Sequence, residues 1–325
     1  YNVEPRMLLE TTMNYIGKSR RDAHPLFAGK IDDFRIYNRP LSPEEIAELA
    51  QAELEEPQPG EPTLPAPVLH YDLTDVTGDT VTDRAGNFHG KWIGADHARW
   101  IGSDVAGFLD FDGGTVASYV EIPGGVLDDL TDATFSILIN WKGKAGAEWA
   151  FALGQNNAKY LYFTPKYNSG DFSARFGIAT DGWRNEVSAK TPTLPANRWK
   201  LITGVMSGTD GKLTLYVDGV EVGSVYTTIT LDDIRNPGAI SGYLGRSFYT
   251  EDPYFGGAIA EFRIYGQALT TGQVALLKAE ADQKISDLRY LAVKLAADAL
   301  DFTRFLGKNA DKDHIVTDLR LADKT

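Results

Sequence analysis

The sequence predicts an all-β fold, a two-sheet antiparallel jelly-roll sandwich, followed by a C-terminal helical segment. Between Val68 and Leu277, short segments alternate apolar and polar residues with the period of a half-buried strand. Gly-rich turns separate these segments, and no convincing helical pattern interrupts them before the region of Thr270. Because strands do not alternate with helices, we expect the sheets to be antiparallel and to pack face to face.

The individual strands can be placed from their alternation. The clearest ones fall at residues 108–113, 119–125, 134–141, 161–165 and 212–225. The last stretch contains Asp218 and Gly219 between two alternating runs. This dipeptide predicts a two-residue hairpin loop, because a type I′ turn needs positive φ at both central positions.

The C-terminal stretch has a different pattern. Between Leu276 and Phe302, apolar side chains at positions 285, 288, 291 and 295 form a stripe among charged residues, which predicts a helix. Beyond Gly307, the apolar positions within 314–321 predict one or two further strands.

An internal repeat organises the chain. Residues 15–49 align without a gap onto residues 243–277, an offset of 228 positions, and 14 of these 35 positions are identical. The second copy has a long series of strands upstream, whereas only fourteen residues precede the first copy. We therefore expect the C-terminal remnant of a first module at 1–50, a stiff Pro/Glu-rich linker at 51–67, a complete module at 68–277 and a separate segment at 278–325.

The remnant carries a strand that lacks its sheet. An isolated strand leaves backbone groups unpaired, so we expect residues 26–37 to pack on the complete module, on another chain or on an upstream fragment. The first residues lack the pattern of a signal peptide, and the chain is expected to begin inside a longer protein.

Composition excludes several function classes. The chain has 45 acidic against 32 basic residues and a net charge of −13, which argues against nucleic-acid partners and against binding to anionic membranes. No cysteine is present, which excludes disulfides, thiolate metal sites and cysteine nucleophiles. No apolar run approaches the roughly 20 residues that span a bilayer, so no membrane insertion is expected.

Several segments, taken in order, resemble a known family. They are VLHYDLTD from Val68, FLDFDGG from Phe108, the strand that ends in Trp141, KLTLYVDGVEVG from Lys212 and YLGRS followed by FRIY from Tyr243. This set resembles the LamG-like members of the concanavalin A-like lectin and glucanase superfamily. The resemblance covers nearly all of residues 68–277 and about 14–49 in the remnant. It implies an accessory module of a large secreted or cell-surface protein that binds glycans or braces neighbouring domains.

The C-terminal segment carries a second resemblance. Residues 278–325 are similar to the opening of the atrophied bacterial immunoglobulin-like domains that follow LamG-like modules in multidomain glycoside hydrolases. The fold expected here is therefore a jelly-roll sandwich with a helical segment that leads into a truncated Ig-like domain.

No catalytic residues are expected within this chain. Hydrolysis of a sugar needs two carboxylates that flank the scissile bond, and the E-x-D-x-x-E pattern of the superfamily's catalytic lineages is absent. The five histidines show no metal-ligand spacing, and neither a G-x-S-x-G elbow nor a phosphate-binding loop is present. A glucanase activity of the module itself is therefore disfavoured.

A structural calcium ion is the metal that we expect. Carboxylates and turn carbonyls suit Ca²⁺, and the resemblance implies an ion between the first and last strands. The expected ligands are Asp72 and Asp83 near the first strand and Glu261 on the last. Alternatively, an acid beside Phe-Arg-Ile-Tyr serves as the partner of Arg263.

Aromatic residues in loops are the expected ligand contacts, because flat rings pack on the C–H faces of sugars. Those within strand patterns are expected in the core: Trp141, Trp199, Tyr216, Phe262 and Tyr265. Trp183 stands out, because a polar set flanks it that can orient a hydroxylated ring: Asp181, Arg184, Asn185 and Glu186. Alternatively, Trp183 only caps the edge of the sandwich. Further expected ligand residues are Trp92, Trp100 and Tyr254, and the loop aromatics Tyr167 and Tyr249 belong to the same group of rings outside the strand patterns.

The expected function is that of a noncatalytic carbohydrate-binding or spacer region of a large secreted glycoside hydrolase. The resemblance implies a parent protein that acts on plant polysaccharides, such as arabinose- or xylose-containing ones, or on host glycans. The expected partners are a polysaccharide or glycan and other domains of the same protein. The alternative is a cell-surface adhesin or structural module that binds protein or glycan without an attached enzyme.

Overall fold

The computed structural model describes two parts of the chain. It describes residues 62–298 apart from 104 and 145, and, nearer the N-terminus, residues 15–19, 21, 23–27, 35–37, 39–43, 45 and 46. The chain divides into two compact units, Tyr1–Glu61 and Pro62–Thr325, and we describe each by itself.

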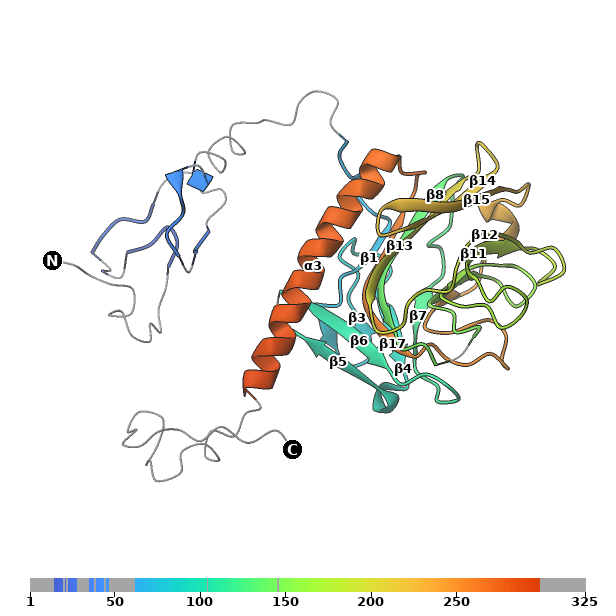
Figure 1. Cartoon of the computed structure of the whole chain (residues 1–325), viewed down its shortest axis with the longest axis horizontal. Coiled ribbons are helices and arrows are strands. Elements are labelled where there is room, and N and C mark those ends of the chain that lie inside the picture. The colour runs from blue at the N-terminus through green and yellow to red at the C-terminus, as the bar shows by residue number, and fades with distance from the viewer. Residues whose placement is uncertain are drawn as a thin grey trace. The chain divides into compact units, whose positions relative to one another are not determined.

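The second unit is a sandwich of two antiparallel sheets (Figure 1). The eight-stranded sheet consists of β1 (Leu69–Tyr71), β5 (Ala98–Gly102), β6 (Gly107–Phe111), β8 (Ala133–Trp141), β13 (Trp199–Ser207), β14 (Lys212–Val217), β15 (Val220–Tyr226) and β17 (Gly257–Tyr265). The nine-stranded sheet consists of β2 (Val76–Thr77), β3 (Thr80–Val81), β4 (Gly90–Ile93), β7 (Tyr119–Pro123), β9 (Phe151–Gly154), β10 (Tyr160–Thr164), β11 (Ala174–Ala179), β12 (Val187–Thr191) and β16 (Ile240–Leu244). A 3-10 turn, η2 (Ala95–His97), and a short helix, α2 (Leu231–Ile234), lie in the connections.

The strand order confirms the predicted sandwich. The first sheet runs β15-β14-β13-β8-β17-β6-β5, with β1 paired to β17, and the second runs β12-β11-β10-β9-β16-β7-β4-β3-β2. Neighbours that are distant in sequence, such as β8 and β17, pair along nearly their whole length. This connectivity closes the sandwich through long-range pairs, which periodicity alone does not predict.

The main core lies between the two sheets. Phe135 in β8 packs between Phe151 and Phe176 of the opposite sheet, with ring centroids 6.0 and 6.1 Å apart. The side chains expected in the interior are buried there or in a second apolar cluster on the outer face of the eight-stranded sheet. The fully or nearly fully buried ones are Trp141, Tyr216, Phe262 and Tyr265, while Trp199 is partly buried.

The hairpin between β14 and β15 has the predicted geometry. Asp218 and Gly219 adopt φ values of 50° and 80°, both in the left-handed region that a type I′ turn requires. The Asp218 carboxylate also accepts a hydrogen bond from Lys200 Nζ at 2.5 Å, which ties the turn to β13.

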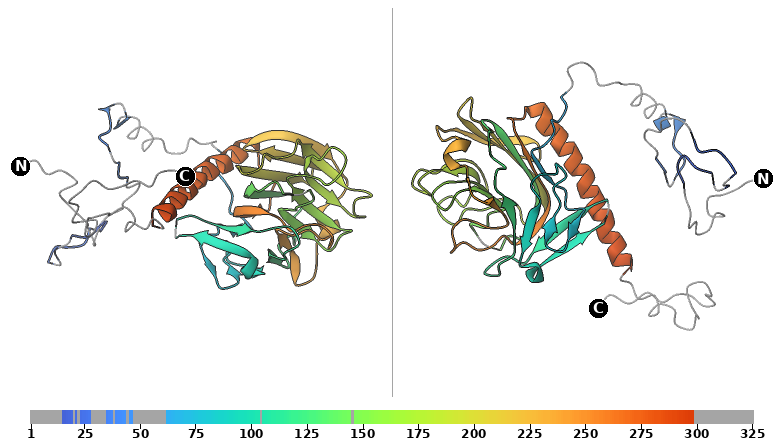
Figure 2. Two further views of the ribbon diagram at one scale, coloured as in Figure 1. Left: turned by 60° about the horizontal axis from the view of Figure 1, so that its bottom comes forward. Right: turned by 180° about the vertical axis from the view of Figure 1, so that it is seen from behind.

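Helix α3 (Thr271–Asp298) covers the outer face of the eight-stranded sheet (Figure 1, Figure 2). Its first turn is capped reciprocally, because Thr270 and Gln273 each accept a hydrogen bond from the other's backbone N–H. Val274, Leu277 and Leu288 are buried against the sheet. The helix is thus continuous across position 277, where the expected module boundary falls.

The first unit repeats the local geometry of the second at the aligned positions. Gly17 and Gly245 have φ values of 77° and 80°, and each accepts a backbone hydrogen bond of 2.9 Å, from Phe27 and Phe255 respectively. Only a residue that tolerates positive φ fits this turn, which explains the glycine in both copies.

A second pair of turns repeats in the same way. Ser42 and Glu45 form the same reciprocal cap as Thr270 and Gln273 do at the start of α3. The two copies are therefore alike in local structure as well as in sequence. Most of the strand expected at 26–37, at residues 28–34, and the strands expected within 314–321 lie outside the described residues.

Candidate functional site

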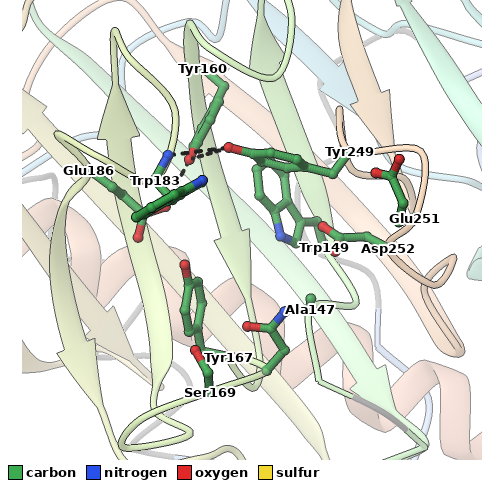
Figure 3. Close-up of a pocket in the computed structure, with 11 residues that line it drawn as sticks. Ala147, Trp149, Tyr160, Tyr167, Ser169, Trp183, Glu186, Tyr249, Glu251 and Asp252 are labelled. Carbon is green, nitrogen blue, oxygen red and sulfur yellow. Dashed lines mark hydrogen bonds between the residues drawn. The ribbon is translucent and has the colours of Figure 1, made fainter.

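A pocket of about 450 Å³ opens on the outer face of the nine-stranded sheet (Figure 3). In β10, Leu161 and Phe163 point into the main core, so Tyr160 and Tyr162 must point to the opposite side. The pocket forms over these two rings, where loops from three parts of the chain meet. Its lining comprises Ala147, Trp149, Tyr160, Tyr167, Asn168, Ser169, Trp183, Glu186, Tyr249, Glu251 and Asp252.

Packed aromatic rings form the floor of the pocket. The Trp149 ring stacks on Tyr162 with centroids 4.1 Å apart and lies 5.0 Å from Tyr160. Tyr249 meets both Trp149 and Tyr160 edge-on at 5.9 Å. Because each ring is fixed by its neighbours, the floor is preorganised for a flat, partly apolar ligand.

The Glu186 carboxylate is the main acceptor in the pocket. Its two oxygens accept hydrogen bonds from Tyr160 at 2.9 Å and Tyr162 at 2.8 Å, and Arg175 lies 3.6 Å away. Burial, and secondly the adjacent carboxylate, raise the pKa of both phenols, so they stay protonated and donate. A carboxylate has about four acceptor positions, so Glu186 can still accept hydrogen bonds from a ligand.

Trp183 forms a wall of the pocket and is 66% exposed. Its backbone N–H donates to Tyr249 Oη at 3.3 Å, and the Arg184 guanidinium lies 5.4 Å from its ring. Asn185 Oδ1 holds the loop by accepting from the backbone N–H groups of Thr180 and Asp181 at 3.1 and 2.8 Å. The loop is therefore fixed while the indole stays open to a ligand.

Carboxylates give the pocket a negative rim. Burial raises the pKa of Asp252 to about 6, against the opposing effect of the 2.7 Å hydrogen bond from Ser247, and the charge of Glu251 raises it further. Arg175 pairs with Glu186 at 3.6 Å and with Asp171 at 3.0 Å, and its guanidinium lies 3.6 Å from the Tyr167 ring. The pocket thus presents three carboxylates, those of Glu186, Glu251 and Asp252. This set of acceptors suits a neutral ligand rich in hydroxyl groups.

Of the expected ligand residues, Trp183 lines the pocket, together with its neighbour Glu186 and the loop aromatics Tyr167 and Tyr249. Asp181 and Arg184 form an exposed ion pair of 3.5 Å in the same loop, and Asn185 holds that loop from within. These three residues support the Trp183 loop without lining the pocket themselves.

The other three expected aromatics lie elsewhere. Trp92 is buried and donates from Nε1 to Ser118 at 3.3 Å. Trp100 is 37% exposed and donates to the Leu73 carbonyl at 2.8 Å. Tyr254 stacks on Tyr119, outside the pocket.

The pocket contains residues that sequence reasoning missed. Trp149 and Tyr160 sit in or beside apolar strands and look like core residues in the sequence. The available signal was that four successive residues of β10, Tyr160 to Phe163, are aromatic or apolar, since a strand with one solvated face should alternate. Such a strand has a second apolar surface on its outer side. The missed lining residues include Trp149, Tyr160 and Asp252.

The three expected calcium ligands are all engaged by protein donors. Both oxygens of Asp83 are used by the backbone N–H groups of His70, Ala85, Asn87 and Phe88, at 2.8 to 3.1 Å. These bonds close the turn after β3. A carboxylate saturated by backbone donors lacks the free oxygens that a Ca²⁺ site requires.

Glu261 is the ion-pair partner of Arg263, one of the two alternatives that the sequence left open. Its Oε1 lies 2.8 Å from Arg263 Nη2, 2.9 Å from His70 Nε2 and 3.8 Å from Lys284 Nζ of α3. Burial alone would raise the pKa of Glu261, but the His70 hydrogen bond and the two cations lower it to about 2. Positive charge already surrounds this carboxylate.

Asp72 completes the set, and it pairs with Arg84 at 2.9 Å. The three carboxylates therefore do not fit a shared cation, and within the described residues no group of three His, Asp or Glu side chains is placed to hold a metal ion. Calcium binding by the chain stays an expectation from the sequence, and these contacts argue against Asp72, Asp83 and Glu261 as its ligands.

The described part of the chain contains no helix that is both long and apolar enough to cross a bilayer. The exposed face of α3 carries many charged side chains instead.

Comparisons with known proteins agree with this architecture. Part of the chain is 32% identical over 160 residues to an α-L-arabinofuranosidase of Bifidobacterium longum subsp. longum. The match covers 48% of this chain and 14% of that enzyme, so the chain spans a small part of its relative's length.

A solved structure shares the fold. Domain 4 of AbnA, a GH43 extracellular arabinanase from Geobacillus stearothermophilus determined in complex with arabinotriose, matches with a TM-score of 0.52 at 21% identity. The match covers 65% of this chain and 98% of that domain.

The family model described as the concanavalin A-like lectin/glucanases superfamily matches residues 2–47 and 112–275, and it therefore includes most of both copies of the repeated block. Since these residues make up more than half of the sequence, the chain belongs to the concanavalin A-like lectin/glucanases superfamily.

Proposed function

We propose that the sandwich is a noncatalytic carbohydrate-binding module whose pocket holds an arabinose-containing plant oligosaccharide. This proposal rests on one observation: aromatic rings and a carboxylate that is fixed in position as a hydrogen-bond acceptor line the same pocket. Trp149 and Tyr249 form a floor, Trp183 forms a wall, and the Glu186 carboxylate lies beside them.

This combination matches the two-sided chemistry of a sugar ring. The C–H faces of the ring pack on aromatic side chains, while its hydroxyls donate to carboxylates. Glu186 and Asp252 supply those acceptors, and their negative charge disfavours acidic sugars within the pocket itself.

The comparisons support arabinose as the sugar. The sequence relative is named as an arabinofuranosidase, and the domain with the same fold belongs to an arabinanase determined with arabinotriose. We accordingly propose that the chain is part of a larger, secreted glycoside hydrolase and brings that enzyme to its polysaccharide.

Binding without hydrolysis is part of the proposal. Glu186 is held by two phenols and serves as their acceptor, so it is not free to act as a general acid. Release of reducing ends from arabinan by the isolated chain would contradict this part of the proposal.

The test is calorimetric titration of the whole chain with arabino-oligosaccharides, with xylo- and cello-oligosaccharides for comparison. The variant Trp183→Ala should bind more weakly. Covering about 70 Å² of the exposed indole at about 25 cal/mol per Å² contributes about 2 kcal/mol, or up to about thirtyfold in Kd.

The matched control is Tyr290→Ala, which removes an aromatic ring that is 73% exposed on α3 and lies outside the pocket lining. It should leave Kd unchanged. Unchanged affinity in Trp183→Ala, or absence of binding to every oligosaccharide tested, would contradict the proposed function.

A further inference from the structure

A second group of aromatic residues on the same sheet surrounds a single arginine. The Arg246 guanidinium lies 4.7 Å from the Tyr119 ring and 4.5 Å from the Tyr243 ring. Tyr254 stacks on the Tyr119 ring, with centroids 5.9 Å apart and an interplanar angle of 9°. All four side chains are partly exposed. We call these four residues the arginine cluster.

The guanidinium of Arg246 has π contacts but no anionic partner among the described residues. No carboxylate or hydroxyl of that part of the chain pairs with it, whereas Arg175 and Arg263 each pair with acids. A guanidinium has five N–H donors in a planar fork that matches a carboxylate. The two tyrosine rings hold this fork in place and leave its donors for a ligand.

The first unit contains one contact of the same kind at aligned positions. Lys18 Nζ lies 5.0 Å from the Tyr15 ring, and Lys18 and Tyr15 align with Arg246 and Tyr243. The type of cation differs between the copies, but a positive charge over a tyrosine face occurs in both. The charge is therefore the shared feature of this position.

The arginine cluster lies on the same sheet face as the pocket. Tyr162, which supports the pocket floor, pairs in register with Ala152, and Ala152 pairs with Tyr243. Two strand spacings, about 10 Å, thus separate the two tyrosines. Phe248 bridges them, since it contacts Tyr243 at 5.4 Å and packs against the aromatic cluster of the pocket floor.

The two sites carry opposite charge. Beside the cluster, Glu121 lies opposite both Tyr243 and Lys91 in the strand register. The side chains of Arg246, Lys91 and Glu121 together carry a net charge of +1. The pocket, by contrast, presents three carboxylates. An oligosaccharide that covers both sites would meet an acceptor-rich pocket at one end and a donor-rich cluster at the other.

We infer that the arginine cluster is a second subsite, in which Arg246 binds the carboxylate of a uronic acid while the pocket holds a neutral sugar of the same glycan. This inference rests on the proposed glycan-binding function and extends it to acidic, arabinose-substituted polysaccharides.

The experiment compares two ligands that differ in one group. The first is an arabinose-substituted oligosaccharide that carries a uronic acid, and the second is the same oligosaccharide after reduction of its carboxyl to an alcohol. The full chain should bind the acidic form about five- to tenfold more tightly at low salt, because a guanidinium–carboxylate bond is charge-assisted. Salt should reduce this preference and leave the affinity for the reduced form unchanged.

Variants assign the preference to Arg246. Arg246→Gln should bind both forms with the affinity that the wild type has for the reduced form, and Arg246→Lys should keep part of the preference. The control Arg198→Gln removes the same charge from an exposed loop before β13, in the other sheet, and should behave like the wild type.

The possible results separate the two proposals. Equal affinity of the wild type for both forms, or a preference that survives in Arg246→Gln, would overturn this inference and leave the proposed function intact. Failure to bind either form would overturn both. An unchanged Tm in Arg246→Gln would show that any loss of preference reflects the missing charge and not unfolding.

Discussion

Replacing Asp252 by Asn should stabilise the protein at neutral and alkaline pH. The pKa of Asp252 is raised to about 6, chiefly by burial at the pocket. The folded protein therefore holds the proton more tightly than the unfolded chain does. The resulting contribution to stability is fully present below the unfolded pKa of about 4 and is lost as pH rises through about 6.

The magnitude follows from the size of the shift. A pKa raised from about 4 to about 6 sets a ceiling of about 3 kcal/mol at pH 8. Asp252 is only partly buried and water screens part of the penalty, so we expect about 1–2 kcal/mol. Asn keeps the oxygen that accepts the hydrogen bond from Ser247, so the substitution mainly removes the charge.

Thermal and urea unfolding of wild type and Asp252→Asn at pH 4 and pH 8 measure this effect. For a domain of this size, about 1–2 kcal/mol corresponds to about 3–6 °C in Tm. The control is Glu221→Gln, which removes the same charge from an exposed position on β15 and should give no pH-dependent difference. An equal effect of Asp252→Asn at both pH values, or destabilisation at pH 8, would refute the reasoning. A charge kept at a cost in stability is typical of a binding site.

Two further predictions concern the ionic site beneath α3. The pKa of Glu261 is lowered to about 2. Its contribution to stability is therefore present above the unfolded pKa of about 4.5 and is lost as pH falls toward 2. Glu261→Gln should accordingly lower the free energy of unfolding by about 3 kcal/mol at pH 7 and by less than half of that at pH 3. Equal losses in urea titrations at the two pH values would contradict this interpretation. Because Asp72, Asp83 and Glu261 are bound by protein donors, a chelator such as EDTA should leave Tm unchanged. A fall in Tm that calcium restores would instead reveal a cation held by other ligands.

Much of the fold could be predicted because it depends on local chemistry. Alternation in β6 and β7 and the Asp218-Gly219 turn are properties of a few adjacent residues. The repeat was equally visible, since a gap-free alignment needs no structure. The start of α3 was placed too late, because the reciprocal cap formed by Thr270 and Gln273 was not recognised.

The binding site could be predicted only in part. Trp183 could be selected because polar neighbours flank an aromatic residue in a loop. Its partners Trp149, Tyr160 and Asp252 come from segments about a hundred residues apart, and nothing in their immediate sequence distinguishes a pocket residue from a core residue. Trp92, by contrast, looked like a loop aromatic and is buried.

The sequence by itself determined the sandwich, its hairpin and the duplicated block, since periodicity and turn residues act over short distances. Only the tertiary structure decided which carboxylates meet which partners. The sequence left Glu261 either as a calcium ligand or as the partner of Arg263, and the positive charge of Lys284 and the hydrogen bond from His70, 191 residues away, favour the second role. Burial and charge are sums over neighbours in space, so the role of a carboxylate is set by the fold and not by the adjacent residues.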